Sequence, residues 1–215
     1  MSSTTTYPTS TTRPRNGLLI AGVATPALFL ATVLVGLAGG RTSGSASASG
    51  LELGPLGWLM SLLFIATGAS ILAFAVGQYR ALSPASRVGT ALLGITGITV
   101  MASGIFTPDA PGAAETAHGQ AHNMLFLVTM LSLVIGFTFN GVKLRRNGFR
   151  GALAHSIAST VALPLLVGVF VTIASDPHDP LYAIGGIIEF GIIAVGFGWI
   201  SINAARILRA ARAAG

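Results

Sequence analysis

The sequence contains no cysteine and very few charged side chains. Its 215 residues include 12 Lys and Arg and 6 Asp and Glu, so that 8% of the chain is charged, whereas 52% is hydrophobic. A soluble domain carries about 25% charged residues, because its surface must be compatible with water. The scarcity of charge therefore excludes a soluble globular protein and predicts an integral membrane protein. The absence of cysteine excludes disulfide bonds, thiol catalysis and iron–sulfur clusters.

Six apolar stretches are each long enough to cross a bilayer as a helix, which takes about 20 residues. The predicted spans are residues 17–40, 53–79, 88–107, 119–142, 151–174 and 181–205. Runs such as SLLFIA at residues 61–66 lack the alternation of a transmembrane β-barrel strand. The predicted fold class is therefore all-α, a six-transmembrane-helix bundle. We expect one domain over residues 17–210, preceded by a disordered, Ser- and Thr-rich cytoplasmic tail at residues 1–16.

The loop Arg41–Gly50 has the composition of a flexible linker. It contains Ala-Ser-Ala at residues 46–48, which resembles a signal-peptidase site, so the first helix is alternatively a cleaved signal. The apolar run of 24 residues before it is longer than the roughly 7–15 of a usual signal core. Retention of the helix is therefore the favoured interpretation.

The basic residues are distributed unevenly among the predicted loops. Eleven of the 12 Lys and Arg fall in the two tails and in the loops after the second and fourth spans, and Arg41 alone falls on the other side. Because positive charge is retained on the cytoplasmic side, both termini are predicted to be cytoplasmic. The net charge of +6 is expected to contact anionic membrane lipids, and its dispersal among loops argues against nucleic acid as a partner.

All six acidic residues and three of the four histidines lie in the predicted outer half, whereas His155 lies near the cytoplasmic end of the fifth span. Asp176, His178 and Asp179 fall in a turn bounded by prolines, where a local turn role is expected. Glu189 lies inside the sixth span, ~12 Å from its outer end at 1.5 Å per residue. A carboxyl group there costs about 2.5–3.5 kcal/mol unless it faces protein or water. Glu189 is therefore expected to face the bundle interior, either with a functional role or as a protonated acid bonded to a backbone carbonyl.

His118 and His122 lie four residues apart at the start of the fourth span, on one helix face, with the spacing of two-histidine metal sites. Asp109 lies nine residues before His118, and the intervening loop contains Pro111 and Gly112 and can fold back over the histidines. Two imidazoles, one carboxylate and an open position would form a catalytic zinc sphere. The alternatives are a hydrogen-bonded His–Asp pair that ties the loop to the helix, or interfacial residues without a shared role.

The segment GIFTPD at residues 104–109, followed by HGQAH at residues 118–122, resembles a bacterial and archaeal membrane family. That family is catalogued as domain of unknown function nine hundred and ninety-eight. It has a phenylalanine-and-aspartate motif that ends one helix and a His-Gly-x-x-His-like motif that opens the next. The segment LELGPLGW at residues 51–58 is similar to its Ser-Glu-Leu-Gly stretch, although Gly50 stands where the family often has a serine.

Glu189 resembles the acidic position in the last helix of that family, although Phe190 follows it where the family often has a basic residue. The resemblance covers about residues 17–210. It implies a six-helix protein in the plasma membrane of a prokaryote, with no assigned activity. It marks the same side chains that the physical reasoning selects: Glu52, Asp109, His118, His122 and Glu189.

These five residues are predicted to line one polar pocket on the outer face. The leading hypothesis is a non-transporting protein whose pocket binds a lipid headgroup, a small polar ligand or a metal ion. The second is a metal-dependent, hydrolase-like enzyme acting on a lipid or isoprenoid at the outer leaflet. In it, Asp109, His118 and His122 would hold a divalent metal such as zinc, and Glu189 would handle protons. The third, a small transporter or exporter subunit, is disfavoured because the chain lacks evident inverted repeats.

Overall fold

The computed structural model describes residues 15–39, 47–174 and 180–213, and these fold into six α helices joined by short connections. The α helices are α1 (Arg15–Ala38), α2 (Gly57–Ala81), α3 (Arg87–Ser103), α4 (Ala117–Arg146), α5 (Ala152–Ala174) and α6 (Gly185–Ala213). A short 3₁₀ helix precedes α2 and another precedes α6: η1 (Ser49–Leu53) and η2 (Tyr182–Ile184). The described residues contain no strand, which confirms the all-α fold class.

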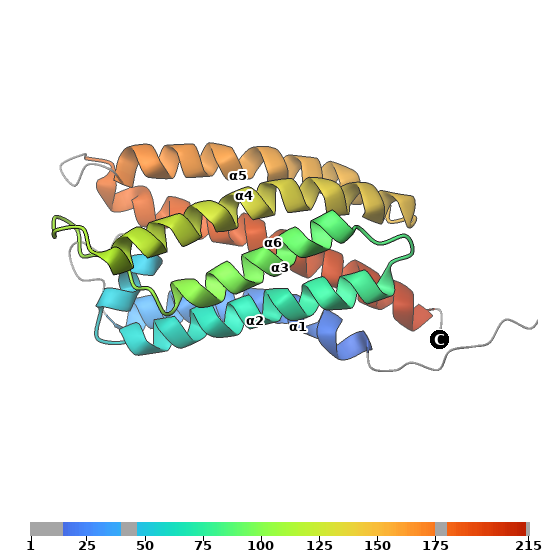
Figure 1. Cartoon of the computed structure of the whole chain (residues 1–215), viewed down its shortest axis with the longest axis horizontal. Coiled ribbons are helices and arrows are strands. Elements are labelled where there is room, and N and C mark those ends of the chain that lie inside the picture. Colours follow the sequence, from blue (N-terminus) through green and yellow to red (C-terminus); the bar gives the residue numbers. More distant parts are fainter. Residues whose placement is uncertain (1–14, 40–46, 175–179, 214–215) are drawn as a thin grey trace, which may run out of the picture.

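The helices form a ring in which each packs antiparallel against its neighbours in sequence, and α6 closes the ring against α1 (Figure 1). The short connections between α2 and α3 and between α4 and α5 favour this arrangement, because they leave consecutive helices side by side. One end of the bundle carries η1, the α3–α4 loop and η2, and we call it the acidic end. The other carries the start of α1, the α2–α3 and α4–α5 loops and the end of α6, and we call it the basic end (Figure 1). The first and last described residues therefore lie at the same end.

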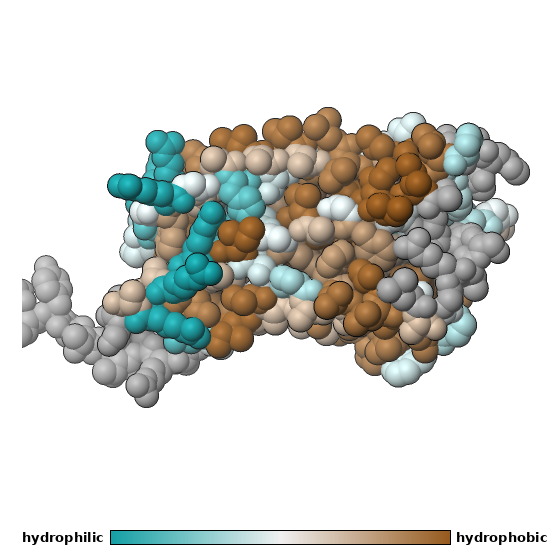
Figure 2. All heavy atoms as spheres, turned by 180° about the vertical axis from the view of Figure 1, so that it is seen from behind, coloured by the Kyte–Doolittle hydropathy of each residue, from teal (hydrophilic) through white to brown (hydrophobic). Residues whose placement is uncertain are grey.

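The outer surface of the bundle is apolar. Figure 2 shows hydrophobic residues around its middle and the strongest hydrophilic colour gathered at one end. The helices α1, α2, α4, α5 and α6 are long and apolar enough to cross a membrane. The apolar helix α3, with 17 residues, is shorter than the about 20 of an average span. These features indicate a multi-pass membrane protein.

Several predicted helix boundaries differ from the structure. Helix α2 begins at Gly57 and not at residue 53, because the chain turns after η1 and the Gly57 N–H donates to the carbonyl of Gly54 (2.9 Å). Helix α3 ends at Ser103 and not at residue 107, because the chain turns at Gly104 ahead of Pro108. Helix α6 begins at Gly185 and not at residue 181, and it continues to Ala213.

Some predicted segments are described only in part. The predicted tail, residues 1–16, lies outside the described residues except for Arg15 and Asn16, which begin α1. The predicted turn with Asp176, His178 and Asp179 also lies outside the described residues. Helix α1 packs against both α2 and α6 as a full member of the ring.

Candidate functional site

Two cavities lie near the acidic end. The first, which we call the vestibule, has a volume of about 520 Å³ and is open. Its lining includes Ser49, Asp109, His122, Phe126, Tyr182 and Glu189. The second, which we call the chamber, has a volume of about 90 Å³ and lies among α1, α2, α3, α4 and α6. Four residues line both: Ser49, His122, Phe126 and Glu189.

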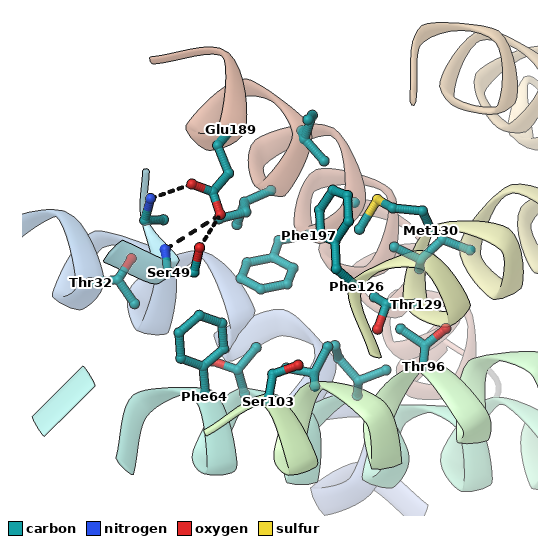
Figure 3. Close-up of a pocket in the computed structure, with 18 of the residues that line it drawn as sticks. Thr32, Ser49, Phe64, Thr96, Ser103, Phe126, Thr129, Met130, Glu189 and Phe197 are labelled. Carbon is teal, nitrogen blue, oxygen red and sulfur yellow. Dashed lines mark hydrogen bonds between the residues drawn. The ribbon is translucent and has the colours of Figure 1, made fainter. Parts of the chain in front are cut away.

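Glu189 joins the start of η1 to α6. Its side chain is 6% exposed and lies four residues beyond the first residue of α6, roughly 6 Å along the helix axis. The carboxylate accepts hydrogen bonds from the backbone N–H of Ala48, the backbone N–H of Ser49 (3.4 Å) and the Ser49 hydroxyl (3.2 Å), as Figure 3 shows. All three of these partners are donors, so the carboxyl group acts as an acceptor in each contact with the described residues. This buried placement agrees with the prediction that Glu189 faces the bundle interior.

Glu52 lies within η1 and joins it to α2. Its Oε1 accepts a hydrogen bond from the Ser61 hydroxyl (3.0 Å), and its side chain is buried. Its Oε2 has no hydrogen-bond partner among the described residues and lies 4.0 Å from the His122 Nδ1. Burial raises the pKa of the Glu52 carboxyl to about 7. The hydrogen bond from Ser61 lowers this pKa in part, and the negative charge of Glu189 raises it further. Burial thus favours the protonated form of Glu52, which lies behind the cavity wall.

His122, like Glu189 and Ser49, is a polar residue that lines both cavities. Its Nδ1 lies 2.7 Å from the backbone carbonyl oxygen of Phe106, at the end of the turn after α3. Because a carbonyl can only accept, Nδ1 must carry the proton in this contact. The hydrogen bond ties the α3–α4 loop to α4.

Asp109 and Thr116 together close the α3–α4 loop. The Asp109 carboxylate accepts hydrogen bonds from the Thr116 N–H (2.8 Å) and hydroxyl (2.7 Å), and Thr116 caps α4 by accepting from the Gly119 N–H (3.1 Å). A Cβ atom at Gly119 would overlap the Asp109 carboxylate, so the loop packs there only against glycine. The Thr116 hydrogen bonds lower the pKa of Asp109, and the charge of His118 lowers it further. Packing of the loop therefore explains why a glycine, Gly119, follows His118.

The predicted site residues are only partly brought together. Asp109, His122 and Glu189 line the vestibule, and Glu52 lies behind His122. The exposed His118 stacks at a tilt on Phe106, with ring centroids 5.4 Å apart. In the described part of the chain, no group of three His, Asp or Glu side chains is arranged to hold a metal ion.

The sequence offered a hydrogen-bonded His–Asp pair as a way to tie the α3–α4 loop to α4. In the structure the loop is tied to α4 through other partners. The hydrogen bonds run from Thr116 to Asp109 and from His122 to Phe106. His155 lies near the start of α5, at the basic end, and is remote from both cavities.

Comparison with known proteins gives one match. The family model described as "Protein of unknown function (DUF998)" matches residues 19–206. The chain belongs to the DUF998 family. Neither a curated protein nor a solved structure matches the sequence. The DUF998 match covers α2 to α5 in full, most of α1 and α6, and all the described residues that line the two cavities.

The partners of the acidic residues were not predicted from the sequence. Thr116 was detectable, since a threonine just before a helix is a common N-cap. Ser49 and Ser61 carry no such pattern, because they meet Glu189 and Glu52 only after η1 has packed between α6 and α2.

Proposed function

We propose that this DUF998 member is a six-span protein of a prokaryotic plasma membrane whose vestibule binds a lipid headgroup or small polar ligand from the outer side. The distribution of charge supports the orientation. The described Lys and Arg residues lie in the helix ends and loops of the basic end, which the positive-inside tendency places in the cytoplasm. Helix α3 is at the lower limit of about 17 residues for a span, and its packing along α2 and α4 supports a sixth crossing.

The vestibule itself is the observation that carries the proposal. Asp109, His122 and Glu189 meet in an open space of about 520 Å³ at the end remote from the basic loops. A concave site with a few convergent polar groups is the usual form of a ligand pocket. Both carboxylates already accept hydrogen bonds from the protein, which holds them in fixed positions. This arrangement favours recognition of a ligand over proton transfer or metal ligation.

The axis of the bundle below the cavities supports a role without transport. The chamber ends at Ile71, Leu133 and Ile200, all of which are buried. At the same depth, the rings of Phe137 and Trp199 stack with centroids 4.3 Å apart. A substrate on this axis would have to displace a close-packed core, which is costly.

The orientation can be tested with single cysteines, because the native chain has none. Ala113 is exposed in the α3–α4 loop and Ser83 is exposed in the α2–α3 loop, at opposite ends of the bundle. In intact cells, we expect a membrane-impermeant maleimide to label Ala113→Cys and to label Ser83→Cys only after lysis. Labelling of both from the same side would contradict the proposed crossing of α3.

The binding proposal can be tested by thermal unfolding of the detergent-purified protein with short-chain lipids that carry ethanolamine or glycerol heads. We expect at least one head to raise Tm, and we expect Asp109→Ala and His122→Ala to lose that rise because both remove vestibule groups. His155→Ala is the matched control and should keep it, because His155 lies at the basic end. Equal losses in all three variants, or no rise with any probe, would reject the proposal.

A further inference from the structure

The walls of the chamber are apolar despite its many hydroxyl groups. The rings of Phe64, Phe126 and Phe197 face it, as Figure 3 shows. Three of its hydroxyls donate back to their own helices: Thr32 to Phe29, Thr96 to Leu92 and Ser103 to Thr99. Two others have side-chain partners, since Ser49 donates to Glu189 and the Thr129 hydroxyl bonds with that of Thr99 (2.7 Å). A hydroxyl committed to a backbone carbonyl leaves mainly its methyl or methylene group for a ligand. A cavity of this kind does not hold water well, because a water needs two to four polar partners.

The chamber extends along the bundle axis from the polar residues into the membrane. On α6 its lining runs from Glu189 to Ile200, eleven residues or roughly 16 Å at 1.5 Å per residue. Figure 3 shows Glu189 and Ser49 on one side of it and Thr129 and Met130 on the other. The vestibule and the chamber share Glu189 and His122, so the more polar space adjoins the narrow apolar one at these side chains.

The charge of the lining restricts the polar part of a ligand. The described residues that line the two cavities include two carboxylates, Asp109 and Glu189, and no Lys or Arg. The buried Glu52 lies behind this lining, and its Oε2, 4.0 Å from the His122 Nδ1, has no hydrogen-bond partner among the described residues. A phosphate or carboxylate head would meet like charge here, whereas an alcohol or ammonium head would find acceptors.

We infer that the natural ligand is a single-chain amphiphile whose hydroxyl or ammonium head lies in the vestibule and whose acyl or isoprenoid tail enters the chamber. This inference rests on the proposed function and names the ligand class. A diacyl lipid is disfavoured, because the chamber is only about 90 Å³ in volume and has room for part of one chain. The head is recognised by the carboxylate acceptors of Glu189 and Asp109, and the tail is recognised by shape.

The test uses the full-length protein in nanodiscs and photoreactive probes with a diazirine at the tail end. The probes are oleylamine, oleyl alcohol and geranylgeraniol, with oleyl phosphate as the anionic counterpart. Mass spectrometry should find the label on chamber residues such as Met130, Leu133 and Ile200. We expect oleyl phosphate to label these residues about tenfold less, because of charge repulsion. Preference for oleyl or geranylgeranyl tails decides between the two tail types, and either result supports the inference.

Two glycines of α6 provide a matched pair of variants. A Cβ at Gly196 would stand 3.5 Å from the Leu133 Cδ1 inside the chamber, whereas a Cβ at Gly198 would have no atom within 4 Å. We expect Gly196→Leu to reduce chamber labelling about tenfold by filling the space, and Gly198→Leu to leave it unchanged. If Gly196→Leu does not fold, Gly196→Ala should fold and give a smaller reduction. Labelling confined to lipid-facing residues, or equal labelling in both leucine variants, would overturn the inference.

The ethanolamine and glycerol heads of the earlier experiment separate this inference from the proposed function. If these heads raise Tm while the long-chain probes never label the chamber, the ligand class is wrong and the vestibule proposal stands. If the heads do not raise Tm and the probes do not label the chamber, the vestibule proposal and the ligand class are both wrong. Strong labelling of chamber residues by oleyl phosphate would overturn only the assignment of a hydroxyl or ammonium head.

Discussion

The two halves of the bundle treat buried polar groups differently. In the half near the basic end, polar side chains bond directly between helices: Gln78 of α2 donates to Asn140 of α4 (2.6 Å), and Trp199 of α6 donates to Ser156 of α5 (2.8 Å). In the half near the acidic end, the Thr99 and Thr129 hydroxyls also bond between α3 and α4 (2.7 Å). The buried carboxyl groups there instead bond through the segment before α2, which is not part of the ring: Glu189 accepts from Ala48 and Ser49, and Glu52 of η1 accepts from Ser61. Polar bonds between helices hold the first half closed. Bonds to a short connecting segment leave the axis of the second half open.

The largest effect is expected in the closed half. Trp199 is fully buried, stacks on Phe137 and donates to Ser156. We expect Trp199→Ala to lower the free energy of unfolding by about 3–5 kcal/mol, the range for large aromatic side chains in cores. Trp58→Ala is the matched control, because Trp58 is 65% exposed on the bundle surface and its loss should matter little. Equal destabilisation of both variants, measured by denaturant titration in micelles, would remove the difference between the halves.

An intermediate effect is expected at the loop that bounds the vestibule. Gly119→Ala places a Cβ against the Asp109 carboxylate, which must move away from Thr116. Such overpacking costs about 1–3 kcal/mol. We expect a lower Tm and faster proteolysis of the α3–α4 loop.

Gly191→Ala provides the control for this substitution, since its Cβ would reach only Leu166, at an ordinary 4.0 Å. Unchanged proteolysis in Gly119→Ala would show that the Asp109–Thr116 contact does not shape the vestibule.

The smallest effect is expected from the pH dependence of Glu52. The pKa of Glu52 is raised from 4.5 to about 7, so the folded protein holds this proton more tightly than the unfolded chain. Stability from this group is therefore present at low pH and is lost as pH rises from about 4.5 to about 7. We expect Glu52→Gln to flatten the profile of Tm against pH over that window and to raise Tm at neutral pH.

Glu115→Gln, at an exposed position of the α3–α4 loop, should leave the slope of that profile unchanged. The groups that face Glu52 are Ser61, His122 and Glu189, and they are intact in both variants. Parallel profiles for Glu52→Gln and the native protein would show that Glu52 is not buried in solution.

Much of the fold was predictable because it depends on local composition. The six apolar runs correspond to six helices, and the resemblance of HGQAH to a family motif agrees with the DUF998 match. The errors lie at helix ends, where Gly54, Gly104 and the segment before Gly185 form turns or 3₁₀ helices within apolar sequence. Hydropathy does not distinguish these conformations from a helix. The crossing of α3 and the metal sphere of Asp109, His118 and His122 stay predictions.

The sequence by itself determined the environment of this protein and its candidate residues. Scarce charge requires lipid around the helices, and the cost of burying a carboxyl group marks Glu189. Tertiary structure decided the rest: which donors reach Glu189, why His122 faces both cavities, and how the vestibule continues into the chamber. These features join η1, the α3–α4 loop, α4 and α6, which are far apart in the chain. Only the packing of the ring fixes the distances between them.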